Sequence, residues 1–391
     1  MTLQPSKVLG IGLVSALGTG VSATVPALYA DNPRLPALPT CLKTDLHLPV
    51  FEVPGLSRQP DQPGGVSMQL LRLALDEALA DARLTKAEMR RLRVGVAIGT
   101  TTACQLNNVP FYAVLRTGQR PAPEPLLDFL NGNLAELIHR ELGLHGPQIT
   151  VSNACASGAD AIGLAHLWLH QDMCDLAIAG GTDELNKIPL DGFNSLGICS
   201  PLPCRPFDAE RRGLNLGEGA GVLIMARTEV PDRPGTTFTV NGFGKTADAY
   251  HITQPSPDGT ELEKAIRQAL AQAGLASDDL GFINAHGTGT QANDLTEASV
   301  FARLYPDGIP YMSTKALTGH TLGAAGAIEA IFTLLMLREQ RAARSHRFST
   351  LPPDIAFAPL RENLPLKDKR FALSTSLAFG GSNTAIILGI Q

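Results

Sequence analysis

The same local layout occurs twice in this sequence, in the same order, and this repetition constrains the fold more than any other feature. Each copy has an apolar run ending in Thr and Gly, then a short strand leading through small residues into an apolar helix, then a Gly-rich loop before an apolar run. The three matching pairs are GVAIGTTTA (95–103) with GFINAHGTGT (281–290), QITVSNACASGADAIGLAHLWL (148–169) with PYMSTKALTGHTLGAAGAIEAIFTLLML (310–337), and LGEGAGVLIMA (216–226) with AFGGSNTAIILG (378–389). Small residues can match by chance, but three matches in one order indicate an internal duplication.

Strand and helix patterns alternate within each copy, which predicts an α/β fold with parallel or mixed sheets covered by helices. The polar, Pro- and Gly-bearing stretch TEVPDRPGTTF (228–238) is the expected boundary, giving halves at 1–232 and 233–391. Residues 31–65 are proline-rich with weak periodicity, so we expect a long surface excursion there and no core element.

Composition excludes several function classes. The net charge of −5 gives no reason to expect nucleic acid or an anionic membrane as a partner, and an acidic protein partner would need a local basic patch. The six cysteines have neither metal-ligand spacing nor the density of a disulfide scaffold. The start lacks a signal-peptide pattern, and apolar runs such as 327–337 are too short for a membrane span. We therefore expect a cytoplasmic protein with free thiols.

Cys155 stands between a strand-like run and a helix-like stripe, surrounded by small residues. Near a helix start, unpaired backbone N–H groups and the helix dipole favour the thiolate, and small neighbours leave room for a substrate carbonyl. A buried structural cysteine is the alternative reading.

Two histidines and a lysine follow apolar runs of the second copy. His286 lies in a Gly/Thr turn, while Lys315 and His320 flank a turn before the second long helix. Taken singly, each has an equally simple structural reading. By the duplication, however, His320 lies near the helix start that matches the start after Cys155, so pseudo-twofold packing brings thiol and imidazoles together. A cysteine protease needs one oriented base, whereas a decarboxylating condensation needs a nucleophile and donors for an enolate.

Six segments, in order, resemble the signature of β-ketoacyl-acyl-carrier-protein synthases of the elongating type with a Cys–His–His site. They are ACASGADAIG (154–163), RPFDAERRGLNLGEGAGVLIM (205–225), DAYHITQPSPDG (248–259), NAHGTGT (284–290), STKALTGHTLGAAGAIEA (313–330) and AFGGSN (378–383). The resemblance runs from about residue 8 to the end. It implies the thiolase fold, with two pseudo-symmetric βαβαβαββ halves in five layers, α-β-α-β-α. It also implies a dimer and a Claisen condensation of an acyl thioester with malonyl-carrier protein, releasing CO2.

Carried over by position, the resemblance implies a role for each matching residue. Cys155 is the acylated nucleophile, and His286 and His320 stabilise the enolate. Lys315 supports the site electrostatically, and Glu329 is its salt-bridge partner. Phe379 is a gating residue whose backbone N–H joins that of Cys155 in an oxyanion hole.

The resemblance also marks two loops and a docking region. The loop from Asp248, which includes Thr253, and the loop with Gly380 and Gly381 resemble a pair that moves together when malonyl carrier is accepted. An acidic carrier protein would dock on Arg205, Arg211 and Arg212, unless these form a surface salt-bridge cluster. Asp294 and Glu297 either order the His286 turn or begin a solvated helix, and Glu218 ties down a loop.

Two other interpretations remain at this stage. A thiolase shares the fold but uses a second cysteine as base, and AFGGSN (378–383) carries none. A chain-length-determining partner subunit usually lacks the nucleophile, which this chain has. Neither a metal nor a nucleotide or redox cofactor is expected. Departures in 31–65 and in TTTACQLNNVPF (100–111) leave open the acyl chain, the carrier protein, the pathway (fatty-acid or polyene/polyketide-like) and the choice between homodimer and heterodimer.

Overall fold

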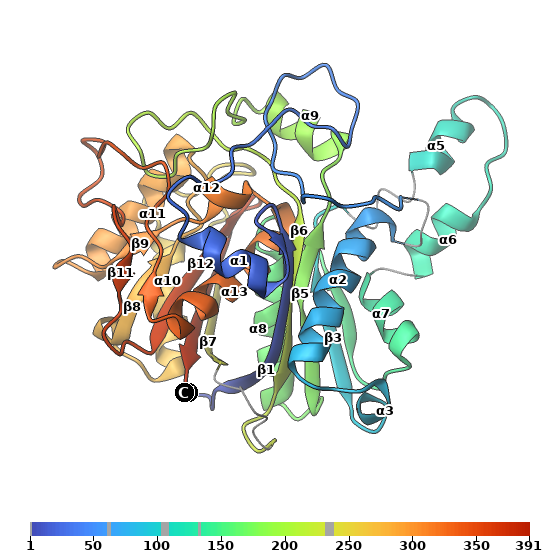
Figure 1. Cartoon of the computed structure of the whole chain (residues 1–391), viewed down its shortest axis with the longest axis horizontal. Helices are drawn as coiled ribbons and strands as arrows, with labels where there is room; N and C mark the ends of the chain where they lie inside the picture. Colours follow the sequence, from blue (N-terminus) through green and yellow to red (C-terminus); the bar gives the residue numbers. More distant parts are fainter. Residues whose placement is uncertain (1, 61–63, 103–108, 132–133, 231–237) are drawn as a thin grey trace.

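The computed structural model describes residues 2–60, 64–102, 109–131, 134–230 and 238–391. Strands of both halves of the described chain belong to one mixed β-sheet (Figure 1). In the first half, the strands lie in the order β4-β3-β5-β6-β1. Their bounds are β1 Ser6–Ser15, β3 Val94–Gly99, β4 Gln148–Val151, β5 Leu176–Asp183 and β6 Gly219–Ala226, and β2 (Gly18–Thr19) pairs only with β1.

The second half repeats this arrangement strand for strand. Its order is β9-β8-β12-β13-β7, so in both halves the five strands run third, second, fourth, fifth, first in chain order. In both, the fifth strand is antiparallel to its two neighbours, and the second strand is parallel to the third and to the fourth. The bounds are β7 Phe238–Ala247, β8 Leu280–Asn284, β9 Tyr311–Met312, β12 Phe371–Ala378 and β13 Ser382–Ile390. Each of the three sequence matches falls on an equivalent strand, which confirms the duplication.

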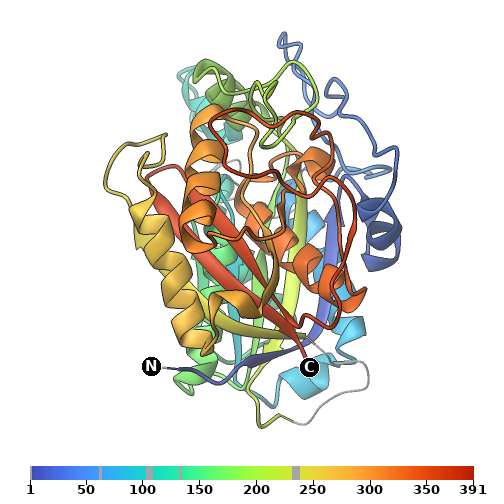
Figure 2. The ribbon, with the colours of Figure 1, turned by 90° about the vertical axis from the view of Figure 1, so that its left-hand side faces the viewer.

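Helices complete a five-layer architecture. The long helices that follow the third strands, α8 (Ser157–His170) and α13 (Ala325–Arg338), pack on each other and lie between the strands of the two halves (Figure 1). On the outer faces, α2 (Gly65–Asp81) and α7 (Leu134–Leu142) cover the first half. In Figure 2, α10 (Thr260–Ala273) and α11 (Gln291–Leu304) lie over the strands of the second half. The expected thiolase fold is confirmed.

Small residues let the two central helices approach closely where they begin. A side chain added at Gly158 would lie 2.8 Å from the carbonyl oxygen of Gly323, and one at Gly326 would lie 2.7 Å from the Cβ of Ala159. Along the rest of its length α13 is buried on all sides, from Ala325 to Leu337, which is why its sequence lacks a polar face. The Gly and Ala residues noted in the sequence therefore bring the two helix starts, and what precedes them, into contact.

The halves are joined within the sheet, because Ser6–Val8 of β1 pair antiparallel with Phe238–Val240 of β7. Much of the expected boundary stretch (residues 231–237) lies outside the described residues. Shorter elements complete the chain. They are α1 Val21–Leu28, α3 Lys86–Met89, α5 Val109–Leu115, α6 Glu124–Asn131, α9 Lys187–Ser195, α12 Lys315–Thr318, η1 Ser277–Asp279, η2 Leu322–Ala324, β10 Arg341–Ala342 and β11 Leu364–Pro365.

The excursion at residues 31–65 departs in part from the prediction. Most of its described part is irregular, but Val50, Phe51 and Val53 are buried, and Phe51 bridges to Gly217 beside β6. Glu218 holds this segment by accepting from the backbone N–H of Val53 and from Arg58. Within the described part of the chain, no helix is both long and apolar enough to cross a membrane.

Candidate active site

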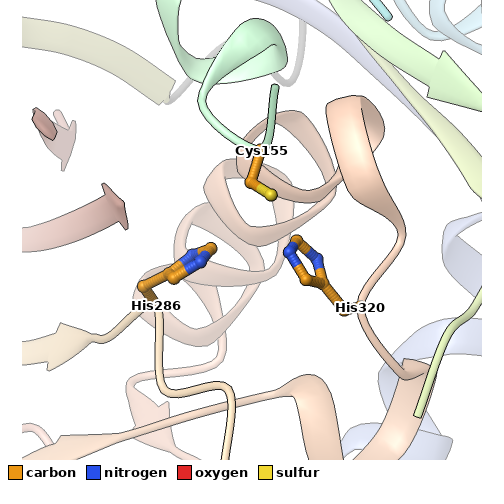
Figure 3. A group of neighbouring side chains, drawn as sticks. All are labelled: Cys155, His286 and His320. Atoms are coloured by element: carbon orange, nitrogen blue, oxygen red, sulfur yellow. The ribbon is translucent and has the colours of Figure 1, made fainter. Parts of the chain in front are cut away.

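Cys155 lies two residues before α8, in a tight turn after β4. Ala154 has a positive φ of 46°, a conformation that non-glycine residues rarely adopt. Ser157 closes the turn, since its hydroxyl donates to the carbonyl of Ala154 at 2.7 Å and accepts from the backbone N–H of Asn153 at 2.8 Å. This strained turn directs the thiol toward the second half of the molecule (Figure 3).

The protonation state of Cys155 departs from the sequence expectation. The side chain is buried, and burial raises the pKa of the thiol to about 12, although Lys315 and a backbone N–H of Phe379 that donates to the sulfur both act to lower it. Desolvation therefore outweighs the favourable helix position. Burial thus favours the protonated thiol, so a reaction at this sulfur would need a neighbouring base to take its proton.

His286 follows β8 in a turn that two buried carboxylates hold in place. Glu297 accepts from the backbone N–H groups of His286 at 2.9 Å and Gly287 at 2.7 Å. Asp294 accepts from the backbone N–H of Gly289 at 3.1 Å. Asp294 and Glu297 therefore order the His286 turn, which confirms the first of the two interpretations given for them. Both side chains lie on the buried side of α11.

His320 reaches the same place from the turn before η2 and α13. Its backbone N–H donates to Asn215 at 2.8 Å, which fixes the turn against the first half. The rings of His286 and His320 are 5.2 Å apart at 85° (Figure 3). One atom each of Cys155, His286 and His320 (the sulfur and two ring nitrogens) lie within 4.8 Å of one another.

Lys315 determines which nitrogen of His286 carries its proton. The side chain of Lys315 is 1% exposed, and its Nζ lies 3.1 Å from His286 Nδ1, 2.6 Å from the carbonyl oxygen of His286 and against a carboxylate oxygen of Glu329. An ammonium only donates, so Nδ1 must accept. Burial lowers the pKa of both His286 and His320 well below the usual value, with the charge of Lys315 adding to the effect. His286 is therefore neutral with its proton on Nε2, whereas the buried Nδ1 of His320 has no hydrogen-bond partner among the residues that the structure describes.

The two loops that the sequence marked are hydrogen-bonded to each other. Asp248 donates its backbone N–H to Gly381 at 2.8 Å and accepts from Asn383 Nδ2 at 2.6 Å. The backbone N–H of Gly380 donates to Ile252 at 2.8 Å. These bonds make residues 248–256 and 378–383 one layer over the thiol.

A cavity of about 340 Å³ leads to the thiol. Cys155, His286 and His320 line it, and so do Asp248, Thr253 and Phe379 from the loops. Two arginines on it differ in exposure: Arg212 is exposed, but Arg211 is only 3% exposed and donates to the carbonyl oxygens of Asp208 and Gln291.

The expected docking role of Arg211 is therefore wrong, because its guanidinium is buried and bonded to backbone carbonyl oxygens, where a partner protein cannot reach it. Arg205 is partly exposed and forms an ion pair with Glu210, as the salt-bridge reading requires.

Comparison with known proteins identifies the family. Residues 65–230 match the β-ketoacyl synthase N-terminal domain, and residues 237–349 match the β-ketoacyl synthase C-terminal domain. The chain belongs to the β-ketoacyl synthase family. It is 31% identical to 3-oxoacyl-[acyl-carrier-protein] synthase 2 of Staphylococcus aureus over 328 residues, which cover 81% of this chain and 79% of that protein. The corresponding protein of Vibrio cholerae is 32% identical over 340 residues, covering 80% of this chain and 79% of that protein.

Solved structures of ketosynthases have the same fold as this chain. The ishigamide ketosynthase/chain length factor superposes with a TM-score of 0.91 at 28% identity, covering 99% of both chains. A β-ketoacyl synthase of Burkholderia phymatum gives 0.88 at 30% identity, covering all of both chains. A ketosynthase structure with its chain length factor from Xenorhabdus doucetiae gives 0.85 at 30% identity, covering 99% of this chain and 98% of that one.

Sequence reasoning missed one aromatic residue in the site of this synthase. Phe193 of α9 stacks on Phe379 with centroids 5.2 Å apart at 18°, and its ring meets that of His320 edge-on at 6.2 Å. It also lines the cavity. Lone aromatic residues in helices are common in cores, so the sequence carried no signal for this contact. Phe193 places an apolar ring between Phe379 and the imidazole of His320.

Proposed function

We propose that this β-ketoacyl synthase condenses an acyl group, held on Cys155 as a thioester, with a malonyl group carried by an acyl carrier protein. One observation supports the proposal: the thiol of Cys155 and the neutral imidazoles of His286 and His320 lie together at a cavity. Lys315 contacts Nδ1 of His286, so the proton of that imidazole is on Nε2. No step in this chemistry calls for a metal or redox cofactor.

In the first half-reaction, Cys155 attacks the acyl thioester of the carrier. Because burial keeps the sulfur protonated, His320 accepts its proton and returns it to the departing carrier thiol. His320 suits this role because its Nδ1 has no hydrogen-bond partner among the described residues that would fix its tautomer, whereas His286 is fixed as a donor at Nε2. The backbone N–H of Phe379, which donates to the sulfur, and that of Cys155 would hold the oxyanion.

In the second half-reaction, malonyl-carrier protein loses CO2 and its thioester oxygen becomes an enolate oxygen. The N–H groups of His286 and His320, both buried side chains, stabilise that charge. The enolate carbon attacks the acyl-Cys155 carbonyl, the C–S bond breaks, and β-ketoacyl carrier is released. The Cys155 sulfur takes up one proton from solvent water, because loss of CO2 from the malonyl carboxylate supplies none. Lys315, neutralised by Glu329, keeps His286 in the donating form throughout.

The hydrogen-bonded loops are proposed as the gate for this cycle. Phe379 and Thr253 line the cavity, so the second carrier substrate reaches the acyl-enzyme only if the layer shifts. Gly380 and Gly381 both have positive φ, which glycine adopts without strain and which lets the layer hinge there.

The two alternatives fit less well. Among the described residues that line the cavity, Cys155 is the single cysteine, so the second thiol of a thiolase has no candidate there. A chain-length-determining subunit does not catalyse, so its function would not require the buried Lys315–Glu329 pair that fixes the tautomer of His286.

The carrier protein would reach the cavity past Arg212, with Arg205 nearby, since acidic partners are attracted by arginine at a cleft mouth.

A second, related subunit completes the assembly in this proposal, either another copy or a chain length factor such as the solved relatives name. β4 is the edge strand of the sheet, and Ile149 on it is 41% exposed. Helices α5 and α6 project from the same side (Figure 1) and expose the apolar side chains Val109, Tyr112, Leu115, Leu127 and Leu130. The mass of the native assembly, measured with and without a co-expressed partner, distinguishes homodimer from heterodimer. The proposal also includes the setting of the reaction: elongation of a fatty-acid or polyene/polyketide-like acyl chain, in the cytoplasm.

The test separates the half-reactions. Incubation with acyl-carrier protein should give a covalent adduct on Cys155 by mass spectrometry and none in Cys155→Ala, and malonyl-carrier protein should then release CO2. His286→Ala should impair decarboxylation far more than acylation, whereas His320→Ala should impair both. An adduct without use of malonyl-carrier protein would instead support a thiolase-like transferase, and no adduct would support the partner-subunit reading.

A further inference from the structure

Cys155, His286 and His320 form a set of donor atoms close to that of a zinc site (Figure 3). The sulfur and one nitrogen of each ring lie within 4.8 Å of one another and all three residues are buried. In tetrahedral zinc coordination by thiolate and imidazole, such atoms lie about 3.4 to 3.6 Å apart, so a closure of about 1 Å per pair would suffice. Three protein ligands facing a cavity would leave the fourth position to water, as in open zinc sites.

One contact opposes metal binding. A zinc ligand must offer a lone pair, so His286 would have to coordinate through Nε2 and carry its proton on Nδ1. The ammonium of Lys315 is 3.1 Å from Nδ1 and is held there by the carbonyl oxygen of His286 and by Glu329. A proton on Nδ1 would face this ammonium directly. Ordinary zinc-bound histidines have the opposite arrangement, in which the second nitrogen donates to an acceptor.

We infer that Lys315 keeps a latent zinc site closed: the Cys155, His286 and His320 side chains bind Zn²⁺ once the lysine is removed, and resist it while the lysine is present. This role is separate from support of the enolate. A thiol and two neutral imidazoles are ligand types that a borderline-soft metal prefers, and in this chain the ammonium of Lys315 opposes that binding.

The placement of the His286 proton distinguishes the two forms of the site. In the protein lacking Lys315, zinc displaces one proton, from the Cys155 thiol, while each histidine coordinates through one ring nitrogen and carries its proton on the other. With Lys315 present, Nε2 of His286 can offer a lone pair only if Nδ1 carries the proton, 3.1 Å from the Lys315 ammonium. That unfavourable contact is the physical basis of the resistance.

The experiment compares zinc binding by the wild-type chain and Lys315→Met, using ZnCl2 alone, with no acyl substrate. Isothermal titration calorimetry in buffers of different ionisation enthalpy gives affinity and proton release, and thermal unfolding gives an independent readout. We expect Lys315→Met to bind one Zn²⁺ at least about 10- to 100-fold more tightly than wild type, the range typical for outer contacts of metal ligands. We also expect one proton released per zinc and a rise in Tm with zinc. Lys315→Met, Cys155→Ala should lose the effect.

Lys245→Met is the matched control, since this lysine pairs with Asp160 and is not among the neighbours of the histidines; it should bind zinc no better than wild type. If Lys315→Met leaves Glu329 too poorly paired for folding, Lys315→Met, Glu329→Gln removes the unpaired carboxylate and carries the same expectation. Equal zinc affinity in wild type and the Lys315 variants would overturn the inference, and so would no binding by either variant. Because no acyl transfer is measured, failure of the proposed condensation would leave this result unaffected.

Discussion

Glu297 offers the most direct test of how the His286 turn is held. Its side chain is fully buried, and each carboxylate oxygen accepts two hydrogen bonds. One oxygen accepts from the His286 backbone at 2.9 Å and from the Thr375 hydroxyl at 2.8 Å, and the other from the Gly287 backbone at 2.7 Å and from Asn293 Nδ2 at 2.9 Å. We consider the substitutions Glu297→Gln and Glu297→Ala.

The magnitudes follow from counting donors. An amide replaces one acceptor oxygen by an NH2 group. The least costly orientation places that group toward Thr375, whose hydroxyl can rotate and whose oxygen, 3.2 Å away, still accepts from the His286 N–H. About one donor is then poorly matched, at about 1–3 kcal/mol. Alanine removes both acceptors, and with at least two donors unsatisfied we expect about 3–5 kcal/mol, a large share of the about 5–15 kcal/mol that stabilises a typical domain.

Urea unfolding followed by fluorescence measures these losses, and trapping of CO2 from malonyl-carrier protein measures the effect on His286. Glu263→Gln and Glu263→Ala are matched controls, because Glu263 pairs with Arg267 and Arg303 near the surface of α10, where such pairs contribute little. Decarboxylation by Glu297→Gln should fall more than Cys155 acylation does. A loss in Glu297→Ala no larger than in Glu263→Ala would refute the donor-counting argument.

Further expectations concern the thiol, the ring of Phe193 and the mouth of the cavity. Since burial raises the pKa of Cys155 to about 12, iodoacetamide should alkylate Cys155 in His320→Ala, which lacks the neighbouring base, at a rate that rises about tenfold per pH unit from 7 to 9, and a rate independent of pH there would show a preformed thiolate. Phe193→Ala removes the stack on Phe379 and should change the relative acylation rates for short and long acyl carriers several-fold, measured by mass spectrometry; unchanged ratios would exclude Phe193 from the acyl path. Arg212→Glu should raise KM for carrier protein about tenfold with kcat nearly constant, whereas Arg211→Ala should instead lower Tm, and the reverse pattern would exchange their roles.

The fold was predicted well because the same order of strands, turns and helices occurs twice. Each copy gave only a weak pattern, and the match between the two copies supported both. The Gly/Thr turns after β3 and β8 and the small residues before α8 and α13 occupy equivalent positions, so each match limited the other. The segment around Phe51 was predicted less well: its proline-rich surroundings gave no periodicity, and its burial depends on contacts with Gly217 and Glu218, far along the chain.

The site was predicted in its members but not in its electrostatics. Cys155, His286, His320 and Lys315 were identified from motif and order, and they do meet in space. The thiolate expectation used only the helix start, because the depth of burial that raises the pKa of Cys155 depends on packing from both halves. Arg211 and Arg212 are adjacent in sequence, and only the backbone path of the folded chain shows that one points inward.

The pairing of β1 with β7 has a consequence for how such a catalyst can be divided. The sulfur comes from one copy of the ancestral unit and both rings from the other, while the equivalent turn after β3 now carries threonines that bind Asp183. Neither copy alone therefore contains the complete site. Fragments produced separately would thus be inert alone, and would recover turnover only by reassembling along that shared strand pair.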